Sequence, residues 1–391
     1  MVDFSTVRQY NFPTVIRFGA GAIAELPGYL AANGLSRPLL VTDPMVAGLG
    51  FFGEIRRALE AKGISAEVFS DIHKNPVKTD VLKGGEAFAA TNRDSVIGIG
   101  GGAAMDVARA VVLRVHHRRD LFDYDDLIGG DQYVTEEVPY FITVPTTAGT
   151  GSEVGRSAII SEDDTHRKRI LFSPKLLAKI VFADPLLTME LPPFVTAATG
   201  MDALTHNLEA YLAKMFHPMC EGIALEGVDL INRSLAQAVH RPDLVSRSRM
   251  LLGSLMGAVA FQKGLGVVHS LAHPLSSLLD THHGLANAVN LPYGMRFNIG
   301  GSEEKFRRIA QVMGLSVEPS GAKVPNEGEA VVERLFAFNQ EVGLPTRLRD
   351  IGVKEEHIET LADLAVADFA HPNNPKPVGR EDFKKLYTEA L

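Results

Sequence analysis

The chain has 391 residues, of which 46% are hydrophobic, and a formal net charge of −8 at pH 7. This length favours two domains, and the mildly acidic charge excludes the basic footprint of a nucleic-acid-binding protein. The single cysteine, Cys220, excludes an internal disulfide and a zinc site built from several thiolates, and it fits a reducing compartment. Residues 1–10 carry no signal-peptide h-region and no apolar run is long enough to span a bilayer, so we expect a cytoplasmic protein that does not contact a membrane.

The first half of the chain alternates between strand and helix patterns. We expect strands at residues 14–18, 38–42, 64–70, 95–99 and 140–144, and helices at 22–33, 53–62, 79–91 and 103–115. Such alternation predicts a parallel sheet that is covered by helices on both faces. Two further runs, at 157–160 and 169–172, are predicted to form a hairpin, and 179–183 is predicted to be a last strand.

The second half of the chain is predicted to be helical. Strand patterns stop after Pro185, and Pro192-Pro193 opens a series of helical patterns that continues to the C-terminus. Two of these patterns cover residues 221–240 and 244–261. We therefore expect an α/β domain at residues 1–187 and an all-α domain at residues 188–391.

A glycine turn follows the predicted strand at residues 95–99. Gly100-Gly101-Gly102 leads into a predicted helix that starts at Ala103, and a helix N-terminus behind a glycine turn is a natural anion site. Gly98, Gly100 and Ala103 also satisfy a loose form of the dinucleotide-binding fingerprint. The same pattern is compatible with a tight turn that needs glycine only for packing.

A second loop strengthens the case for a dinucleotide. Residues 145–153 follow the predicted strand at 140–144 and interleave threonine and serine with glycine, which offers backbone and side-chain donors to phosphate. Asp43 ends the predicted strand at 38–42, where an acid can accept both ribose hydroxyls and repel a 2′-phosphate, so NAD is favoured over NADP. The alternative for Asp43 is a turn-forming role before Pro44.

Polar residues cluster within the predicted helical half. Asp202 and His206 are four residues apart, which places both on one helix face, and His269 and His273 repeat this spacing. His282 and His283 follow shortly afterwards. Burying so many polar groups without a ligand would be costly, and a carboxylate with several imidazoles suits a divalent transition metal.

Together these segments resemble the iron-containing, or group III, alcohol dehydrogenase family. The resemblance extends over roughly residues 10–300 and rests on five motifs in order: Gly100–Asp106, Pro145–Glu153, Gly200–His206, Gly264–Pro274 and His283-Gly284. It implies the dehydroquinate synthase-like fold, with an N-terminal NAD-binding α/β domain, a C-terminal helical metal-binding domain and the active site in the cleft between them.

The resemblance also implies roles for individual residues. It places the metal ligands at Asp202, His206, His269 and His283, and it places His273 where the family has a histidine implicated in proton relay. The cofactor-binding residues that it implies are Asp43, Asn75, Gly101, Gly102, Asp106, Thr146, Thr147, Thr150 and Lys168. One departure is Ala103, since many members carry serine there, and its side-chain hydrogen bond to the cofactor is lost.

The function implied is that of a metal-dependent, NAD(H)-linked alcohol dehydrogenase or aldehyde reductase that acts on a small primary alcohol or aldehyde. We expect Fe²⁺ as the metal, although an aspartate with three histidines also accepts Zn²⁺ or other divalent ions. We expect a homodimer or larger homo-oligomer. The alternatives are a non-redox synthase or lyase on the same scaffold, and an oxidoreductase resembling glycerol dehydrogenases or maleylacetate reductases.

Two cations lie close in sequence to the expected active site. Arg156 follows the second loop, and Lys263 lies six residues before His269. One interpretation makes both of them solvated surface residues. The sharper hypothesis is that one or both of them bind an anionic substrate tail such as a carboxylate, sulfonate or phosphonate, which would make a short semialdehyde acid the substrate.

Overall fold

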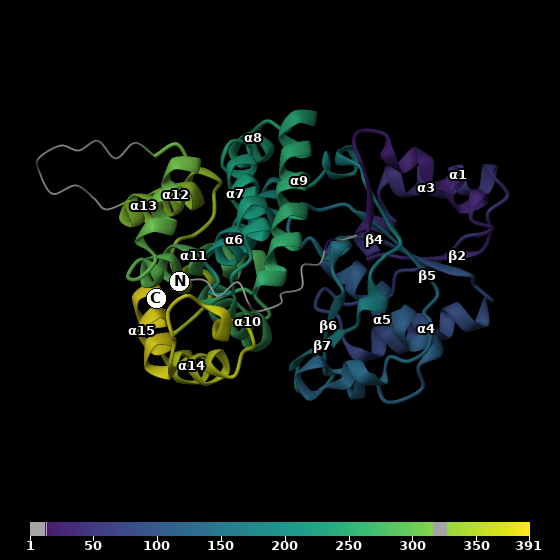
Figure 1. Cartoon of the computed structure of the whole chain (residues 1–391). Helices are drawn as coiled ribbons and strands as arrows, with labels where there is room; N and C mark the ends of the chain where they lie inside the picture. The colour runs from purple at the N-terminus through teal and green to yellow at the C-terminus, as the bar shows by residue number, and fades with distance from the viewer. Residues whose placement is uncertain (1–11, 13, 316–326) are drawn as a thin grey trace, which may run out of the picture. The chain divides into compact units, whose positions relative to one another are not determined.

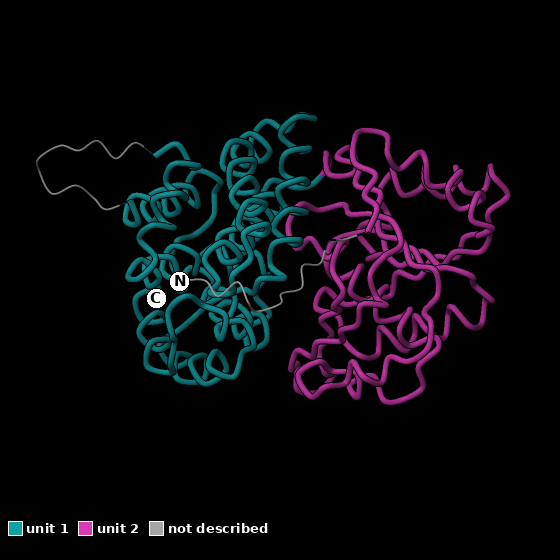
Figure 2. The backbone as a smooth tube through the Cα atoms, viewed as in Figure 1, with its two compact units in different colours: residues 1–12, 191–391 teal, residues 13–190 magenta. Residues whose placement is uncertain are grey.

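The computed structural model describes residue 12 and residues 14–315 and 327–391. The chain divides after Glu190 into two compact units (Figure 2). We call residues 13–190 the sheet unit and residues 191–391 the helical unit.

The sheet unit is built on six parallel strands (Figure 1). In the order of pairing they are β1 (Val15–Phe18), β8 (Ile180–Ala183), β5 (Tyr140–Pro145), β4 (Ser95–Gly100), β2 (Pro38–Val41) and β3 (Glu67–Phe69). The helices of this unit are α1 (Leu26–Ala32), α2 (Pro44–Ala47), α3 (Gly50–Ala61), α4 (Lys78–Ala90) and α5 (Gly102–His116). The predicted α/β class and parallel sheet are confirmed.

Helices cover both faces of this sheet. Successive residues of β2 point to opposite faces, so Leu39 and Val41 pack in the core that contains α4 and α5, while Leu40 packs in the core that contains α1 and α3. All six residues of β4 are buried, as expected for a central strand that is covered on both sides. The sequence therefore shows near-continuous apolar runs in place of strict alternation.

The hairpin predicted after the sheet is also confirmed. Strands β6 (Ser157–Ser161) and β7 (Lys168–Phe172) pair antiparallel. Ser161 pairs with Lys168 in this ladder and forms an isolated bridge with Val77, so the hairpin lies beside the segment that precedes α4.

The helical unit is organised around α6 (Pro193–Leu212), which is buried continuously from Thr196 to Leu212. The neighbours packed directly on α6 are α7 (Pro218–Asn232), α8 (Leu235–His240), α9 (Leu244–Ala260) and α11 (His283–Asn298). The remaining helices are α10 (Val267–Leu279), α12 (Glu303–Val312), α13 (Glu327–Glu341), α14 (Ile358–Val366) and α15 (Arg380–Ala390). Because α6 is enclosed on all sides, each polar residue on it needs a partner.

One predicted helix is wrong in its extent. The pattern at residues 221–240 is two helices, α7 and α8, which are interrupted at Arg233 and Ser234. Both helices pack against α6, so the apolar periodicity continues across the break and hides it. The α8 contact is close, since a Cβ added at Gly200 of α6 would lie 2.3 Å from Leu235.

Among the described helices, one is long and apolar enough to cross a membrane by length and composition alone. It covers Leu244–Lys263, and 56% of its apolar window is buried. It packs against α6 and α7, and its buried residues include Arg247 and Ser254. Core helices pass the same test, and these contacts make α9 a core helix of the helical unit.

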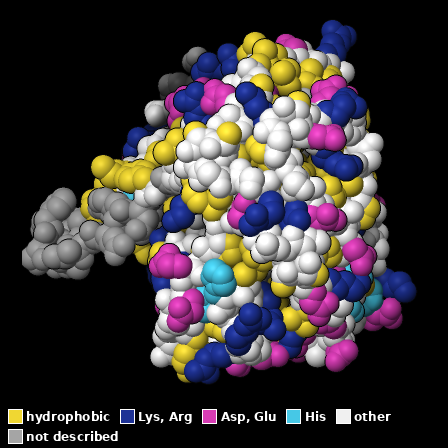
Figure 3. Space-filling model, turned by 90° about the vertical axis from the view of Figure 1, so that its right-hand side faces the viewer, with side chains coloured by type: hydrophobic (Ala, Val, Ile, Leu, Met, Phe, Trp, Pro, Cys, Tyr) yellow, Lys and Arg dark blue, Asp and Glu magenta, His cyan; other side chains and the backbone are white. Residues whose placement is uncertain are grey.

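Acidic and basic side chains are intermixed on the face shown in Figure 3, with apolar side chains between them. Neither sign of charge dominates that face. This distribution agrees with the mixing of acids and bases along the sequence.

Candidate metal centre and cofactor site

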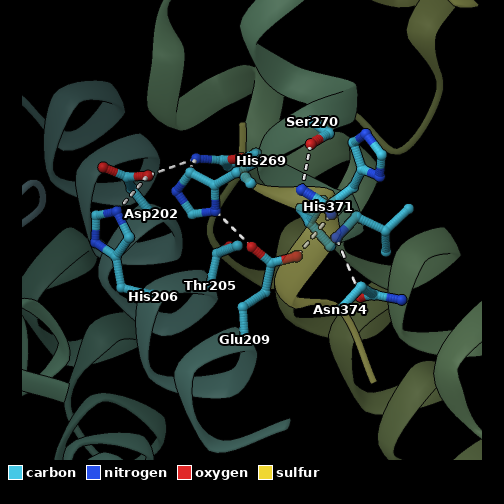
Figure 4. Close-up of polar contacts among 12 residues, drawn as sticks. Asp202, Thr205, His206, Glu209, His269, Ser270, His371 and Asn374 are labelled. Carbon is cyan, nitrogen blue, oxygen red and sulfur yellow. Dashed lines mark hydrogen bonds and ion pairs between the residues drawn. The ribbon is translucent and has the colours of Figure 1, made fainter. Parts of the chain in front are cut away.

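Three helices bring the four predicted metal ligands together. Asp202 and His206 lie one turn apart on α6, His269 lies in the first turn of α10, and His283 begins α11. One ligand atom from each of these residues lies within 4.8 Å of the other three. Figure 4 shows the first three side chains and the elements that carry them.

The ligand atoms lie close to one another. Oδ1 of Asp202 lies 3.5 Å from Nε2 of His283 and 3.9 Å from Nε2 of His206. The rings of His206 and His269 stack with their centroids 4.8 Å apart. One carboxylate oxygen with three imidazole nitrogens is a donor set that suits a divalent first-row transition metal.

Burial of the cluster is uneven. Asp202, His206 and His269 are 5% exposed or less, whereas the side chain of His283 is 27% exposed. A buried carboxylate is costly without a counter-charge, and a divalent cation would supply one. Catalytic metal sites keep one side accessible for substrate, and the partial exposure of His283 is compatible with such a site. The residues therefore fit a divalent metal.

Asn287 contacts the same cluster and was missed by the sequence analysis. Its Nδ2 donates to Oδ1 of Asp202 at 2.6 Å, and it lies 3.1 Å and 3.3 Å from Nε2 of His283 and His269. Asn287 is four residues after His283 on α11, so helical periodicity could have identified it. Its amide orients the carboxylate of Asp202.

Glu209 was also missed, although it shares a helix face with Asp202 and His206. Its Oε2 lies 2.6 Å from Nδ1 of His269, and its Oε1 accepts a hydrogen bond from the Val268 amide at 2.6 Å (Figure 4). A residue three positions after one ligand and seven after another lies on the same side of a helix. The spacing therefore carried a signal that the sequence analysis did not use.

His273 is held by a different carboxylate. Its Nδ1 lies 2.7 Å from Oδ2 of Asp368, and its ring stacks on that of His283 with a centroid distance of 5.4 Å. Burial alone would raise the pKa of Asp368, but His273 and the hydroxyl of Ser270 outweigh it and lower this pKa to about 2. Asp368 is therefore ionised and fixes the orientation of His273.

The structure corrects the substrate role predicted for Lys263. Its Nζ donates to the carbonyl oxygens of Tyr211 and Ala213 at 2.8 Å and 2.6 Å and lies 3.0 Å from Glu221. These three acceptors use all three ammonium protons. Burial and the nearby Lys305 lower the pKa of Lys263, whose side chain is fully buried. Lys263 thus caps the C-terminus of α6 and has no proton left for a substrate anion.

Several of the predicted cofactor residues of the sheet unit follow neighbouring strands. Strands β5, β4 and β2 are adjacent in the sheet. From β2 the next strand in the chain, β3, lies on one side, whereas from β4 the next strand, β5, lies on the other side, so the direction of strand addition reverses between β2 and β4. Parallel sheets bind ligands at the carboxyl ends of the strands, at such a change of direction. Asp43, Gly101 and residues 145–153 follow these three strands.

The glycine turn and the second loop are in contact. The amide of Thr146 donates to the Gly100 carbonyl at 3.0 Å. A Cβ added at Gly102 would lie 2.8 Å from the side chain of Thr150, which would then have to move. Helix α5 begins at Gly102, which directs its first amides toward this pair of loops.

The position of Asp43 is compatible with both predicted roles, ribose binding and formation of the turn before Pro44. Its Oδ1 accepts hydrogen bonds from the amides of Met45 and Val46 and caps α2. Its Oδ2 faces the glycine turn, since a Cβ added at Gly100 would lie 3.4 Å from it. Oδ1 thus caps α2, while Oδ2 is directed at the candidate dinucleotide site beside the glycine turn.

Asp106, which was predicted to bind the cofactor, takes part in a hydrogen-bond network at the start of α5. Its Oδ1 accepts from the Ser152 hydroxyl at 2.7 Å and from Arg109 at 3.2 Å, and its Oδ2 accepts from the Ile159 amide at 3.2 Å. Arg109 is fully buried and also donates to the Ser152 hydroxyl at 2.8 Å. This network ties α5 to the second loop and to β6.

Three further predicted residues lie in the sheet unit. Asn75 precedes the bridge between Val77 and Ser161, and Lys168 pairs with Ser161, so the structure brings their segments together. The guanidinium of Arg156 lies over the ring of Phe172, 5.4 Å from its centroid. Arg156 is half-buried, burial lowers its pKa, and no acidic partner is found for it within the described residues.

A parallel sheet with a glycine turn, together with a buried carboxylate and three imidazoles, is the combination expected of a metal-dependent enzyme that uses a nicotinamide cofactor. The model of the iron-containing alcohol dehydrogenases matches residues 13–185, and the model of the C-terminal part of the Fe-containing alcohol dehydrogenase family matches residues 196–391. The chain belongs to the iron-containing alcohol dehydrogenase family.

Individual relatives agree with this assignment. A 4-hydroxybutyrate dehydrogenase from Cupriavidus necator is 36% identical over 389 residues, covering 97% of this chain and 98% of the relative. The crystal structure of a 1,3-propanediol oxidoreductase matches with a TM-score of 0.93 and 33% identity, covering 98% of this chain and 100% of that one. The structure of sulfoacetaldehyde reductase from Bifidobacterium kashiwanohense with NAD⁺ matches with a TM-score of 0.84 and 27% identity, covering 98% and 99%.

The predicted family, enzyme class and cofactors are therefore confirmed. The protein is an NAD-dependent alcohol dehydrogenase or aldehyde reductase for small substrates, and its cofactors are NAD(H) and a divalent metal, with iron indicated by the family.

Proposed function

We propose that Asp202, His206, His269 and His283 hold the divalent metal of this enzyme. The observation that carries the proposal is the gathering of their ligand atoms within 4.8 Å of one another inside the helical unit. The amide of Asn287, bonded to Asp202 at 2.6 Å, positions the carboxylate ligand.

When bound, the metal supplies a Lewis acid for the substrate oxygen, and the nicotinamide supplies or accepts the hydride. His273 is the proposed residue for moving the hydroxyl proton. Its Nδ1 lies 2.7 Å from Asp368, and Nε2 is the nitrogen proposed to accept a proton from the alcohol or to return one to it. The carboxylate also keeps the imidazole in one orientation.

The cofactor is proposed to bind at the carboxyl ends of β2, β4 and β5. The amides at the start of α5, with Gly101 and Gly102, would receive the pyrophosphate, and the hydroxyls of Thr146, Thr147 and Thr150 offer further donors. Oδ2 of Asp43 is proposed to bind the ribose, and Asn75 and Lys168 complete the predicted set. Ala103 supplies no hydroxyl, so the backbone carries that part of the contact.

For the substrate we propose a short aldehyde with an anionic tail, such as a semialdehyde acid. Arg156 is half-buried without an acidic partner among the described residues, and a guanidinium in that position favours an anionic ligand. Two of the relatives are named for compounds with an anionic tail: 4-hydroxybutyrate, which is a primary alcohol, and sulfoacetaldehyde, which is an aldehyde.

The test follows NADH oxidation by the metal-reconstituted enzyme with succinic semialdehyde and with butanal. Net NADH consumption is expected, and it separates an oxidoreductase from a synthase or lyase that only recycles the cofactor. The Arg156→Ala variant should lose about ten- to a hundredfold in kcat/KM for the semialdehyde acid, the equivalent of roughly 1.5–3 kcal/mol, while its activity with butanal changes little.

The matched control is Arg167→Ala, which removes an exposed positive charge from the same hairpin. It should leave the ratio of the two activities as in the wild type. A wild type that favours butanal, or equal losses on both substrates in the Arg156 variant, would make Arg156 an ordinary surface cation.

We propose further that the enzyme is cytoplasmic and assembles as a homodimer or larger homo-oligomer. The buried thiol of Cys220, whose pKa is raised by burial to about 11, needs no oxidising compartment. Light scattering of the purified protein measures the assembly directly, and a monomer at micromolar concentration would contradict the oligomer.

A further inference from the structure

A buried carboxylate contacts His269 through the ring nitrogen that does not face the other ligands. Glu209 on α6 is 2% exposed, and its Oε2 lies 2.6 Å from Nδ1 of His269 (Figure 4). The other ring nitrogen, Nε2, faces the cluster and lies 3.3 Å from Nδ2 of Asn287.

We propose that Glu209 is a positioning residue that sets which nitrogen of His269 carries the proton and thereby keeps Nε2 available to the metal. The inference rests on the metal site proposed above. Oε1 of Glu209 is committed to the Val268 amide at 2.6 Å. An ionised carboxylate only accepts hydrogen bonds, so Oε2 requires a proton on Nδ1. The neutral ring then carries its lone pair on Nε2, directed at the ligand cluster.

The start of α10 is arranged around this contact. The residue that precedes the helix, Gly266, has no side chain to cap it, and the amides of Val267 and Val268 bond instead to Asn374 and Glu209 from other parts of the chain. A Cβ added at Gly266 would lie 2.9 Å from Oε1 of Glu209 and 2.7 Å from Oδ1 of Asn374. The absence of a side chain at 266 therefore leaves room for Glu209 to reach both the helix and His269.

Replacement of Glu209 by glutamine changes hydrogen-bonding character without changing size. The single amide oxygen of glutamine is needed by the Val268 amide, so the NH₂ group would face Nδ1 of His269 and donate to it. The ring would then carry its proton on Nε2, where it blocks the metal. An equivalent amide substitution in the Ser-His-Asp triad leaves geometry intact but gives the wrong tautomer.

The same helix supplies a matched control. His273, one turn after His269, is held by the carboxylate of Asp368 in the same way, with an oxygen 2.7 Å from Nδ1. His273 is not among the four clustered ligands. Asp368→Asn therefore removes a second buried carboxylate from an imidazole of α10 and should leave metal affinity as in the wild type.

The experiment titrates the metal-stripped full chain with Co²⁺ and follows the visible absorption of the bound ion. A competing chelator allows dissociation constants to be measured that are too low for direct titration. The proteins are wild type, Glu209→Gln, Asp368→Asn, His269→Ala and the double variant Glu209→Gln/His269→Ala. Thermal unfolding of the metal-free forms checks that each is folded. Glu209→Gln is expected to weaken Co²⁺ binding by about 10- to 100-fold.

The double variant shows whether Glu209 acts through His269. The loss caused by Glu209→Gln should disappear when His269 is already alanine, because the two residues act as one unit. Wild-type affinity in Glu209→Gln, or independent additive losses in the double variant, would overturn the inference. Wild-type affinity in His269→Ala would instead overturn the proposed metal site.

Should Glu209→Gln fail to fold, Glu209→Asp replaces it in the same cycle. Aspartate keeps an acceptor-only group but is shorter, so a partial loss of affinity is expected that again vanishes in the His269→Ala background. A partial loss that persists there would count against the inference.

Discussion

Asp43 divides its two carboxylate oxygens between a helix cap and the glycine turn. The charge directed at that turn should repel the extra phosphate of NADP, so the wild type should prefer NADH. Asp43→Gly removes both functions, whereas Asp43→Asn keeps an acceptor for the amides of Met45 and Val46 and removes only the charge. Both variants should gain at least about tenfold in the ratio of kcat/KM for NADPH to that for NADH, or ~1.4 kcal/mol.

Because Asp43→Asn keeps the cap of α2, a change in its cofactor preference reports the loss of charge and not a disturbance of the local fold. A wild type that prefers NADPH, or a pair of variants whose cofactor ratio does not change, would show that Asp43 only caps α2.

Glu153, at the end of the second loop, is a buried acid whose ionisation should lower the stability of the folded protein. It is 1% exposed, no described residue bonds to its Oε1, and burial raises its pKa to about 7. Since this pKa is above its ordinary value of 4.5, the native state holds the proton more tightly than the unfolded chain does. The contribution of protonated Glu153 to the unfolding free energy is fully present below pH 4.5 and is lost as the pH rises through about 7.

The matched variant for Glu153 is glutamine, which resembles the protonated acid and cannot ionise. Between pH 4.5 and 8 the wild type should lose up to about 3 kcal/mol of unfolding free energy relative to Glu153→Gln. Chemical denaturation of both proteins across this range measures the difference, in which other titrating groups cancel. Parallel pH profiles would show that Glu153 stays ionised in the native state.

At the scale of residues, helical periodicity in the sequence identified the predicted metal ligands but not the residues that hydrogen-bond to them. The one-turn spacings of Asp202 with His206 and of His269 with His273 predicted residues that the structure brings together. Glu209 shares the helix face of Asp202 and His206, and Asn287 lies one turn after His283 on α11, so both were available to the same argument. Asp368 lies 95 residues from His273, so only the packing of α10 with the segment after α14 reveals it.

The role of Lys263 could not be derived from the sequence for a similar reason. Its acceptors at Tyr211 and Ala213 lie about fifty residues earlier, at the end of a helix whose position is set by tertiary packing. A lysine before a histidine motif gives no local sign that its ammonium caps another helix.

At the scale of elements, the close approach of α11 to α6 positions His283. A Cβ added at Gly284 would lie 2.4 Å from the Ala198 carbonyl oxygen, a backbone atom that cannot turn away. Gly284→Ala should therefore push the start of α11 from α6, cost about 1–3 kcal/mol of stability and weaken metal binding through His283. Thermal unfolding and Co²⁺ titration measure the two effects.

Gly222→Ala is the matched control for this substitution. Nothing lies within 4 Å of a Cβ at that exposed position of α7. Alanine there should stabilise the protein by about 0.5–1 kcal/mol and leave metal affinity unchanged. If the Gly284 variant behaved like the Gly222 variant, the close helix contact would not be what holds His283.

The limits of the predicted elements follow from what periodicity measures. The central strands were predicted to within a residue, because β4 and β5 are buried apolar runs bounded by turns. The break between α7 and α8 was missed, because both helices present apolar residues to α6 and the pattern does not change at Ser234.

At the scale of the whole molecule, alternation in the first half and helical periodicity in the second half predicted the class of each part. The order of strands in the sheet was not predicted, since β1 pairs with β8 across 165 residues and no local pattern encodes that pairing. The neighbouring positions of β2, β4 and β5, which bring Asp43 and the two loops together, therefore required the structure.

The central claim is that Asp202, His206, His269 and His283 bind a metal on which activity depends. The most direct test measures metal content and NADH-linked activity in the wild type, His283→Ala and the neighbouring His282→Ala. We predict that both quantities fall sharply in His283→Ala and persist in His282→Ala, because only His283 belongs to the ligand cluster. Full metal content and activity in His283→Ala, or loss of both in His282→Ala alone, would contradict the account.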